Sequence, residues 1–245
     1  GSCGVNYDVY DVRSRSSGKT IGEVLPRENN EPVVRSYPSV EAIRSSFSHV
    51  TALYCYNNPA TGKPELVIVR RDIPGGGKTF SQFSAAGAGF IAKAPKVKPL
   101  YNRSRVNTAA SVVFVEGEKC VHALHDLGIV ATTAPGGCKA VKADIDFTPL
   151  AGKRVTFWPD NDGGGIQHMK DIAAKLEHLT PPAISFWLDP AELNLPEKGD
   201  CVDFIANVDA SREAVIATIE SATPIGAGSG IDRFIRDAIN GKYEA

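Results

Sequence analysis

Two aspartates separated by a single asparagine, Asp160 and Asp162, follow a short apolar run and precede three glycines in the segment FWPDNDGGG. Like charges held this close repel each other, so such a pair usually has a cation or a proton between its members. The glycines carry no side chains, and bare backbone lets a phosphate approach closely. The spacing therefore predicts a site for a cation or a shared proton on this loop.

Further carboxylates follow other apolar runs of the chain. Glu116 follows the run 111–115, and Asp200 follows the run 183–188 after a longer loop. If these runs are neighbouring parallel strands, their carboxyl ends meet at one edge of the sheet, and the carboxylates converge with the aspartate pair. Such oxygen ligands suit Mg²⁺, which keeps several waters and shares its shell with substrate phosphates. An aspartate at a strand end also caps the following helix, and any one of them could do only that.

Two other loop types share part of this pattern. An EF-hand loop beginning at Asp160 needs Asp or Asn at its fifth position and Glu at its twelfth, where Gly164 and Asp171 stand, so we reject it. A phosphatase of the haloacid dehalogenase type also has two aspartates one residue apart after a strand. It wants a hydroxyl residue in place of Gly164 and leaves Glu116 unexplained, so it is the weaker alternative.

The glycine segment at residues 74–79 ends like a phosphate-binding P-loop, in Gly-Lys-Thr. The first glycine of that motif falls on Asp72, and the segment lies between two predicted strands rather than before a helix. A glycine turn that carries an exposed Lys78 accounts for it better.

From residue 111 onward, the chain alternates predicted strands with predicted helices. The strands cover 111–115, 129–133, 154–158 and 183–188, and the helices cover 119–127, 166–179 and 212–219. This alternation predicts an α/β fold, with a central parallel sheet flanked by helices.

The first hundred residues have a different pattern. Alternating apolar residues at 51–56 and 65–71 predict a hairpin, with a third strand near 79–83 and a short helix over 39–47 after an irregular arm. We therefore predict a smaller, mostly antiparallel α+β subdomain over 1–106, a catalytic domain over 107–222, and a linker with a helix over 223–245.

Charge is unequally divided between the two parts of the chain. Residues 1–110 hold 15 Lys and Arg against 8 Asp and Glu, and the remainder hold 12 against 20. A basic part joined to an acidic part suggests a polyanionic partner for one and metal for the other, while chance scatter on two solvated surfaces is the alternative. Residues 63–105 are the most basic stretch, and aromatic residues are interleaved there, a mixture that suits single-stranded nucleic acid. These aromatics are Phe80, Phe83, Phe90 and Tyr101.

The five cysteines form no CxxC pair, which argues against a zinc site, and their odd number argues against a disulfide scaffold. A reducing, cytoplasmic setting fits this usage. No apolar run approaches the roughly 20 residues that a membrane span needs, so we expect no membrane association.

Together these segments resemble a known domain. VEGEK at 115–119, ATTAPGG at 131–137, WPDNDGGG at 158–165 and KGDCVDF at 198–204 resemble the Toprim domain of bacterial-type primases, topoisomerases and some nucleases. Over about residues 98–206, the sequence of these motifs is most similar to the primase part of phage and plasmid primase-helicases. The resemblance implies a Toprim fold in a protein of the bacterial cytoplasm, encoded by a phage or a plasmid.

The resemblance also implies roles for the acidic residues. Glu116 corresponds to the glutamate that acts as general acid or base, or as a metal contact. Asp160 and Asp162 correspond to the catalytic metal-binding pair. Asp200 completes the metal site, and Asp203 positions the ligands without contacting the metal itself.

The implied activity is that of a DNA primase, which synthesises short RNA primers on a single-stranded DNA template with Mg²⁺ or Mn²⁺. The implied partners are the template, nucleoside triphosphates and a replicative helicase. The chain has neither the four-cysteine zinc module nor the helicase P-loop of such proteins, so it resembles a catalytic fragment or a pared-down relative. A Toprim-type nuclease or a non-catalytic nucleic-acid-binding module is the alternative. The residues that we expect to bind nucleotide or DNA are Lys119, Lys139, Arg70, Arg71, Lys78, Lys98 and Arg103.

Overall fold

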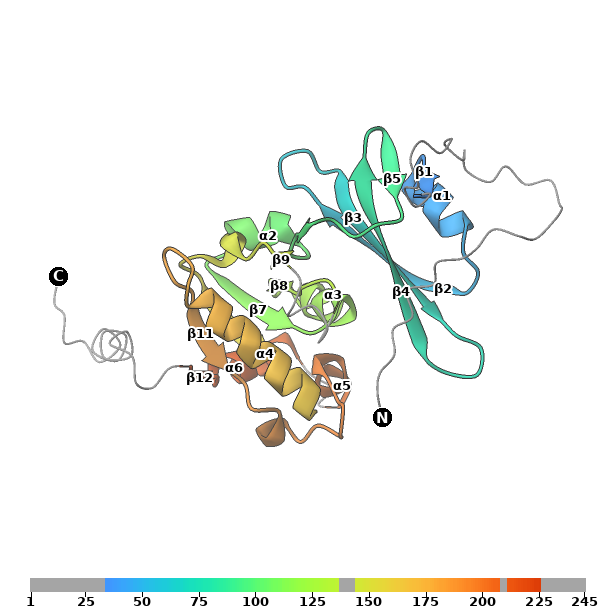
Figure 1. Ribbon diagram of the computed structural model, residues 1–245. Helices are drawn as coiled ribbons and strands as arrows, with labels where there is room; N and C mark the ends of the chain where they lie inside the picture. Colours follow the sequence, from blue (N-terminus) through green and yellow to red (C-terminus); the bar gives the residue numbers. More distant parts are fainter. Residues whose placement is uncertain (1–33, 137–143, 208–210, 226–245) are drawn as a thin grey trace.

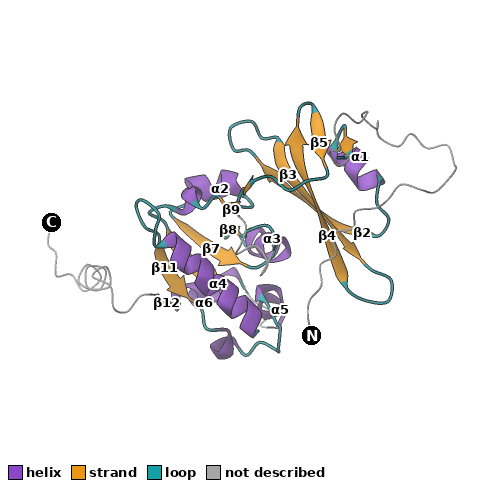
Figure 2. Ribbon diagram, viewed as in Figure 1, coloured by secondary structure: helices purple, strands orange, loops and turns teal. Residues whose placement is uncertain are grey.

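The protein is described by a computed structural model, which covers residues 34–136, 144–207 and 211–225. In these ranges the chain forms two five-stranded sheets, one from the first part of the sequence and one from the second (Figure 1). Helices and strands alternate in the second part, so the α/β class predicted from the sequence is confirmed (Figure 2). The predicted C-terminal helix lies outside the described residues, as does most of the N-terminal arm.

The N-terminal sheet is antiparallel throughout, and its strand order is β1-β5-β4-β3-β2. The predicted hairpin and third strand are present, and the third strand is longer than expected. The strands are β1 (Ser36–Tyr37), β2 (Val50–Asn57), β3 (Pro64–Asp72), β4 (Lys78–Ala86) and β5 (Gly89–Ile91).

The two faces of this sheet are buried against different partners, because successive side chains of a strand point to opposite faces. Val67, Val69 and Phe83 pack with Ile43 of helix α1 (Val40–Ser45) on one face. Ser39 caps this helix as predicted, since its hydroxyl accepts a hydrogen bond from the Ala42 N–H at 3.1 Å. On the other face, a cluster formed by Tyr54, Tyr56, Leu66 and Ile68 packs against Tyr101 of the following segment.

The C-terminal sheet has the order β12-β11-β10-β7-β8, in which all neighbours are parallel except the edge strand β12. Its inner strands are rich in valine, phenylalanine and tryptophan, as expected of parallel strands buried on both faces. The strand expected over 129–133 is only two residues long. The strands are β7 (Ser111–Val115), β8 (Ala131–Thr132), β10 (Arg154–Trp158), β11 (Ile184–Trp187) and β12 (Thr223–Pro224).

Helices cover both faces of this parallel sheet. Helix α4 (Gly163–Leu176) packs with α2 (Arg103–Thr108) in the core on one face. The helices α3 (Glu118–Asp126), α5 (Cys201–Asn207) and α6 (Arg212–Glu220) share the core on the other. A short pair of strands, β6 (Val97–Lys98) and β9 (Asp144–Ile145), lies beside the sheet. Among the described residues, no helix has the length and apolar character that crossing a membrane requires.

Candidate active site

The acidic residues singled out in the sequence lie at the carboxyl edge of the parallel sheet. Glu116 directly follows β7, and Asp160 follows the adjacent strand β10, whose Trp158 pairs with Val115 of β7. The charges of Asp162 and Asp200 act on the pKa of Glu116. The predicted convergence of these carboxylates at one edge is thus present in the structure.

Asn161, the residue between the two aspartates, is hydrogen-bonded to the loop that precedes Asp200. Its backbone N–H donates to the Gly199 carbonyl at 2.8 Å, and its own carbonyl accepts from the Lys198 N–H at 2.9 Å. Its side-chain amide donates to the carbonyls of Leu195 at 2.9 Å and Pro196 at 3.1 Å. The sequence reasoning gave Asn161 no role, yet these four bonds bring the loop before Asp200 beside the aspartate pair.

Glu116 points toward the beginning of helix α4. Its Oε1 atom is buried and has no hydrogen-bond partner among the described residues. A Cβ atom at Gly165 would overlap this oxygen, so the third glycine of the segment makes room for the glutamate. This observation gives Gly165 a definite role and leaves the predicted approach of a phosphate as a prediction.

Two of the carboxylates resist ionisation in their positions. Burial raises the pKa of Asp160 to about 7, with further contributions from the charges of Glu116 and Asp200. Burial likewise raises the pKa of Glu116, and the charge of Asp162 adds to the effect. Groups of this kind are stabilised when a proton or a cation neutralises them.

Asp162 and Asp200 have other partners as well. Asp162 caps helix α4, because its Oδ1 accepts a hydrogen bond from the Gly165 N–H at 2.7 Å. Asp200 is almost wholly buried; its Oδ1 accepts from the Val202 N–H at 2.9 Å, and its Oδ2 forms an ion pair with Lys119. The helix-capping role that the sequence left open for any single aspartate thus applies to both.

Asp203 supports Asp200 from one turn further along α5. Its Oδ2 accepts a hydrogen bond from the Asp200 N–H at 2.9 Å, so each residue caps the other's backbone. The part of the chain that the structure describes contains no group of three or more His, Cys, Asp or Glu side chains arranged to hold a metal. Of the four carboxylates, Asp162 and Asp200 cap helices and Asp200 also pairs with Lys119, whereas Glu116 and Asp160 have neither kind of contact in the described residues.

The basic residues predicted to bind nucleic acid are divided among different surroundings. The positive charge of Lys78, the first residue of β4, acts on Glu116 and lowers its pKa. Arg70 lies on the neighbouring strand β3, and its Nε is 3.7 Å from Asp72 Oδ1. Arg71 points to the opposite face, where its guanidinium lies 4.7 Å from the centre of the Phe47 ring.

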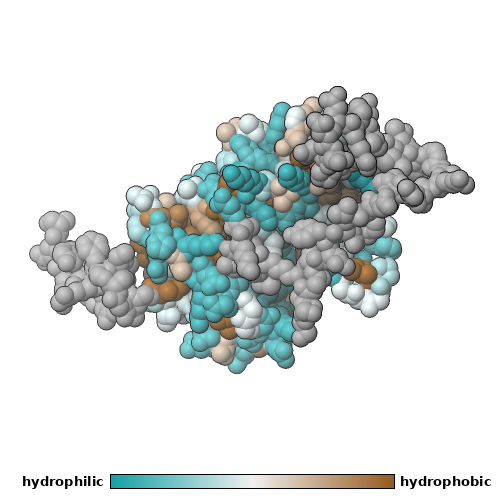
Figure 3. All heavy atoms as spheres, viewed as in Figure 1, coloured by the Kyte–Doolittle hydropathy of each residue, from teal (hydrophilic) through white to brown (hydrophobic). Residues whose placement is uncertain are grey.

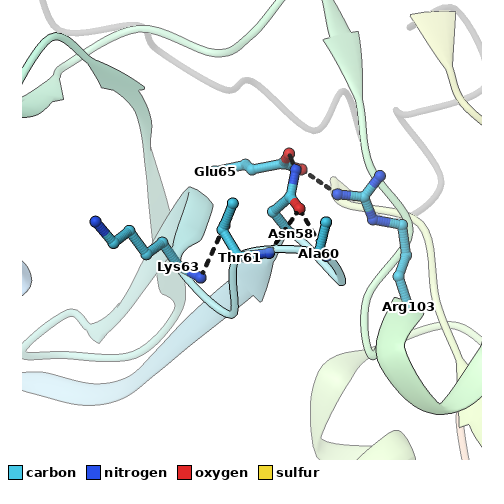
Figure 4. Close-up of polar contacts among 6 residues, drawn as sticks. All are labelled: Asn58, Ala60, Thr61, Lys63, Glu65 and Arg103. Atoms are coloured by element: carbon cyan, nitrogen blue, oxygen red, sulfur yellow. Dashed lines mark hydrogen bonds and ion pairs between the residues drawn. The ribbon is translucent and has the colours of Figure 1, made fainter.

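Arg103 lies at the junction of the two sheets. It forms an ion pair with Glu65, which also accepts a hydrogen bond from Asn58 in the turn between β2 and β3 (Figure 4). Lys98 lies in β6, where burial lowers its pKa. Lys139 lies outside the described residues.

Glu118 is a buried residue that the sequence reasoning missed. It begins helix α3 two residues after Glu116, and its Oε1 accepts a hydrogen bond from the Tyr56 hydroxyl of the N-terminal sheet at 2.7 Å. Burial raises the pKa of Glu118, which the bond from Tyr56 opposes. This contact joins helix α3, which follows Glu116, to the N-terminal sheet.

A separate cavity of about 460 Å³ lies at the opposite, amino edge of the parallel sheet, where Ser111, Arg154 and Ile216 are among its lining residues. Ligands of open parallel sheets bind outside the carboxyl ends of the strands. We therefore place the candidate site at the carboxylates and not at this cavity.

Comparisons with known proteins give a match in structure but none in sequence. No protein-family model matches the chain, and no curated protein sequence matches it. The zinc-binding and RNA polymerase domains of Aquifex aeolicus primase superpose on 85% of this chain and 54% of their own length, with a TM-score of 0.51 and 16% identity. This chain is similar in fold to a bacterial primase.

The chain spans about half the length of that Aquifex fragment. The primase fragment of the bacteriophage T7 primase-helicase protein is a weaker match, with a TM-score of 0.43 and 15% identity over 68% of this chain and 62% of its own. At these identities the likeness concerns the fold alone, and what the site does has to be argued from its residues.

Proposed function

We propose that this chain is the catalytic core of a DNA primase with a Toprim fold, which joins nucleotides on a single-stranded DNA template. One observation carries the proposal. Glu116 and Asp160, two carboxylates with raised pKa values, lie together at the carboxyl edge of the parallel sheet, and the charge of Lys78 from the N-terminal sheet acts on Glu116. Carboxylates that bind a cation, together with a nearby lysine, suit a reaction in which negative charge develops on the transferring phosphoryl group of a polyanionic substrate. The fold shared with the Aquifex primase fragment agrees with it.

The donor set fits a divalent cation. Glu116 offers a buried oxygen without a hydrogen-bond partner, and Asp160 is held in a position where neutralisation lowers its free energy. Mg²⁺ is commonly held by one or two carboxylates, with water and substrate phosphates completing its shell. Glu116 and Asp160 would hold Mg²⁺ or Mn²⁺, with Asp162 and Asp200 beside them. Bound there, the ion supplies charge neutralisation at the transferring phosphoryl group.

The chain's own residues position the reactants. The raised pKa of Asp160 means that a bound cation stabilises its ionised form, which suits this carboxylate to the role of a metal ligand. Lys78 and Arg70 lie on the face of the N-terminal sheet that is turned toward this edge, where they attract the triphosphate and the template backbone. The contact of Tyr56 with Glu118 holds that sheet to helix α3, which follows Glu116.

Two of the proposed partners, a single-stranded DNA template and nucleoside triphosphates, are the substrates of this reaction. A replicative helicase as a further partner, and a setting in the bacterial cytoplasm with the gene on a phage or plasmid, are proposed from the resemblance of the sequence to primase-helicases.

The test is incorporation of labelled nucleotides on single-stranded templates with Mg²⁺ or Mn²⁺. We expect template-dependent products from the wild-type chain and none above background from Asp160→Ala. Asp126→Ala is the matched control, because it removes an exposed aspartate at the far end of α3, and it should retain wild-type activity.

Other outcomes assign the site differently. Template shortened without extension would replace the proposal with a nuclease. Binding of the template with neither extension nor cleavage would leave a nucleic-acid-binding module.

A further inference from the structure

The four aromatic residues interleaved with the basic stretch have different positions in the fold. Phe83 and Phe90 belong to the core under α1, and Tyr101 packs between the two sheets. Phe80 is 47% exposed, which makes it one of the few large hydrophobic side chains of the described residues that lie open to solvent. A hydrophobic spot lies at the lower right of the molecule, over the end of the β3–β4 hairpin, where Ile73 is exposed as well (Figure 3).

The pairing of β3 and β4 determines the face on which Phe80 lies. Phe80 is directly opposite Arg70, and Lys78 is opposite Asp72. Paired residues share a face, and residues two apart on one strand share it as well. Phe80, Arg70 and Lys78 therefore lie on the same face as Ile68, which packs toward Tyr101 and the parallel sheet.

This face continues past the contact between the sheets and extends toward the carboxylates. The Tyr101 contact covers its part near Ile68, while the part from Arg70 to the glycine turn at residues 75–77 extends beyond it. Lys78, next to that turn, acts electrostatically on Glu116. In Figure 1 the arrowhead of β7 points toward the side of the molecule where this end of the hairpin lies.

We propose that Phe80, flanked by Arg70 and Lys78, is a stacking platform for a base of single-stranded nucleic acid on its way to the carboxylates. An exposed aromatic ring suits this ligand because every base has a flat face to stack on, whatever the sequence. The two cations beside the ring suit the phosphates on either side of that base. The inference deepens the proposed function by naming where the template is held, and its choice of ligand rests on that function.

The charge of this face favours nucleic acid over an apolar protein partner. Arg70, Lys78 and Asp72 share the face with Phe80, so it carries two positive charges against one negative. Arg70 Nε lies 3.7 Å from Asp72 Oδ1, whereas Lys78 forms no ion pair among the described residues and is the cation most available to a phosphate. An apolar protein partner would instead require the cations beside Phe80 to lose water without phosphates to pair with.

The experiment measures fluorescence anisotropy of a labelled thymidylate homopolymer with the full chain, in EDTA and without nucleotides. We expect Phe80→Leu to weaken binding about tenfold, because leucine keeps the apolar bulk but loses the aromatic face. Phe80→Tyr should bind like wild type. Lys78→Ala should weaken binding and reduce the slope of log affinity against log salt concentration by about one. Phe80→Leu should leave this slope unchanged.

The matched control is Val97→Ala, which truncates another exposed hydrophobic residue, 48% exposed, away from this face. It should bind like wild type, and thermal melts of all variants should coincide because the side chains are exposed. Equal binding by Phe80→Leu and wild type overturns the inference. So does an equal loss in Phe80→Leu and Phe80→Tyr, or failure of the wild-type chain to bind.

The outcome is distinguishable from that of the proposed function, because neither metal nor nucleotide is present. If Phe80→Leu weakens binding while no primers are made, the platform stands and the primase proposal falls. If primers are made while Phe80→Leu binds normally, the platform alone falls. A protein captured on this face in place of nucleic acid, with no homopolymer binding, also overturns it.

Discussion

Replacing Asp160 by asparagine should stabilise the fold while it removes activity. The pKa of Asp160 is raised from 3.8 to about 7, so the folded state binds a proton more tightly than the unfolded state does. Stability therefore falls as the pH rises from about 4 to about 7, and the ionised carboxylate is destabilising above that range. Asparagine keeps the shape of the side chain and cannot ionise, so the variant does not lose this stability.

The magnitude follows from the change in pKa. A tenfold change in an ionisation constant corresponds to about 1.4 kcal/mol, which gives about 4 kcal/mol for the full difference at high pH. Asp160 is partly exposed, and solvent and salt screen its interactions, so we expect about 1–2 kcal/mol. For a chain of this size, that corresponds to a rise in Tm of about 5 °C at pH 8.

The assay is urea or thermal unfolding of wild type and Asp160→Asn in EDTA, at pH values from 4 to 8. The variant should equal wild type near pH 4 and become more stable as the pH rises through 7. Added Mg²⁺ should then raise the Tm of wild type more than that of the variant. A variant that is equally or less stable than wild type at pH 8 in EDTA would refute the reasoning.

Three further substitutions test separate parts of the site. Gly165→Ala should reduce primer synthesis at least tenfold, since its Cβ would displace Glu116. Gly163→Ala is the matched control and should keep activity, because Gly163 is the first residue of helix α4 and there is open space at its Cβ. Tyr56→Phe should lower the free energy of unfolding in urea by about 1–2 kcal/mol, because the buried Glu118 carboxyl loses its hydrogen bond. Tyr37→Phe should leave it unchanged, because the Tyr37 hydroxyl makes no hydrogen bond among the described residues. Equal effects of the two substitutions would contradict a stabilising bond between Tyr56 and Glu118. Asn161→Ala should speed hydrogen exchange in the loop of Leu195 to Gly199, while slow exchange as in wild type would show that this loop is held by other contacts.

The sequence predicted the strands of the parallel sheet well, for a physical reason. The runs 111–115 and 154–158 are mostly apolar because both faces of these strands are buried, and their bounds in the structure agree with the prediction. The run at 129–133 forms only a two-residue strand, because it lies at the edge of the sheet next to β7 alone. Edge strands gain less from pairing, so an apolar run overestimates their length.

The partners of individual site residues could not be predicted, because they depend on contacts between distant parts of the chain. Glu118 and Tyr56 are 62 positions apart, and Asn161 bonds to carbonyls 34 and 35 positions away. Neighbouring Arg70 and Arg71 looked equivalent as nucleic-acid ligands, yet the register of β3 sends them to opposite faces of the sheet. A residue's type and spacing indicated the chemistry, while the register and the loop contacts determined which residues are available for it.

The most direct test of the account is primer synthesis by the wild-type chain and Glu116→Gln on a single-stranded template with Mg²⁺. We expect template-dependent extension products from the wild-type chain. Glu116→Gln should lose at least a hundredfold of this activity, and its melting temperature at pH 8 in EDTA should be no lower than that of wild type. Extension by Glu116→Gln at the wild-type rate, or no extension by a folded wild-type chain that binds its template, would contradict it.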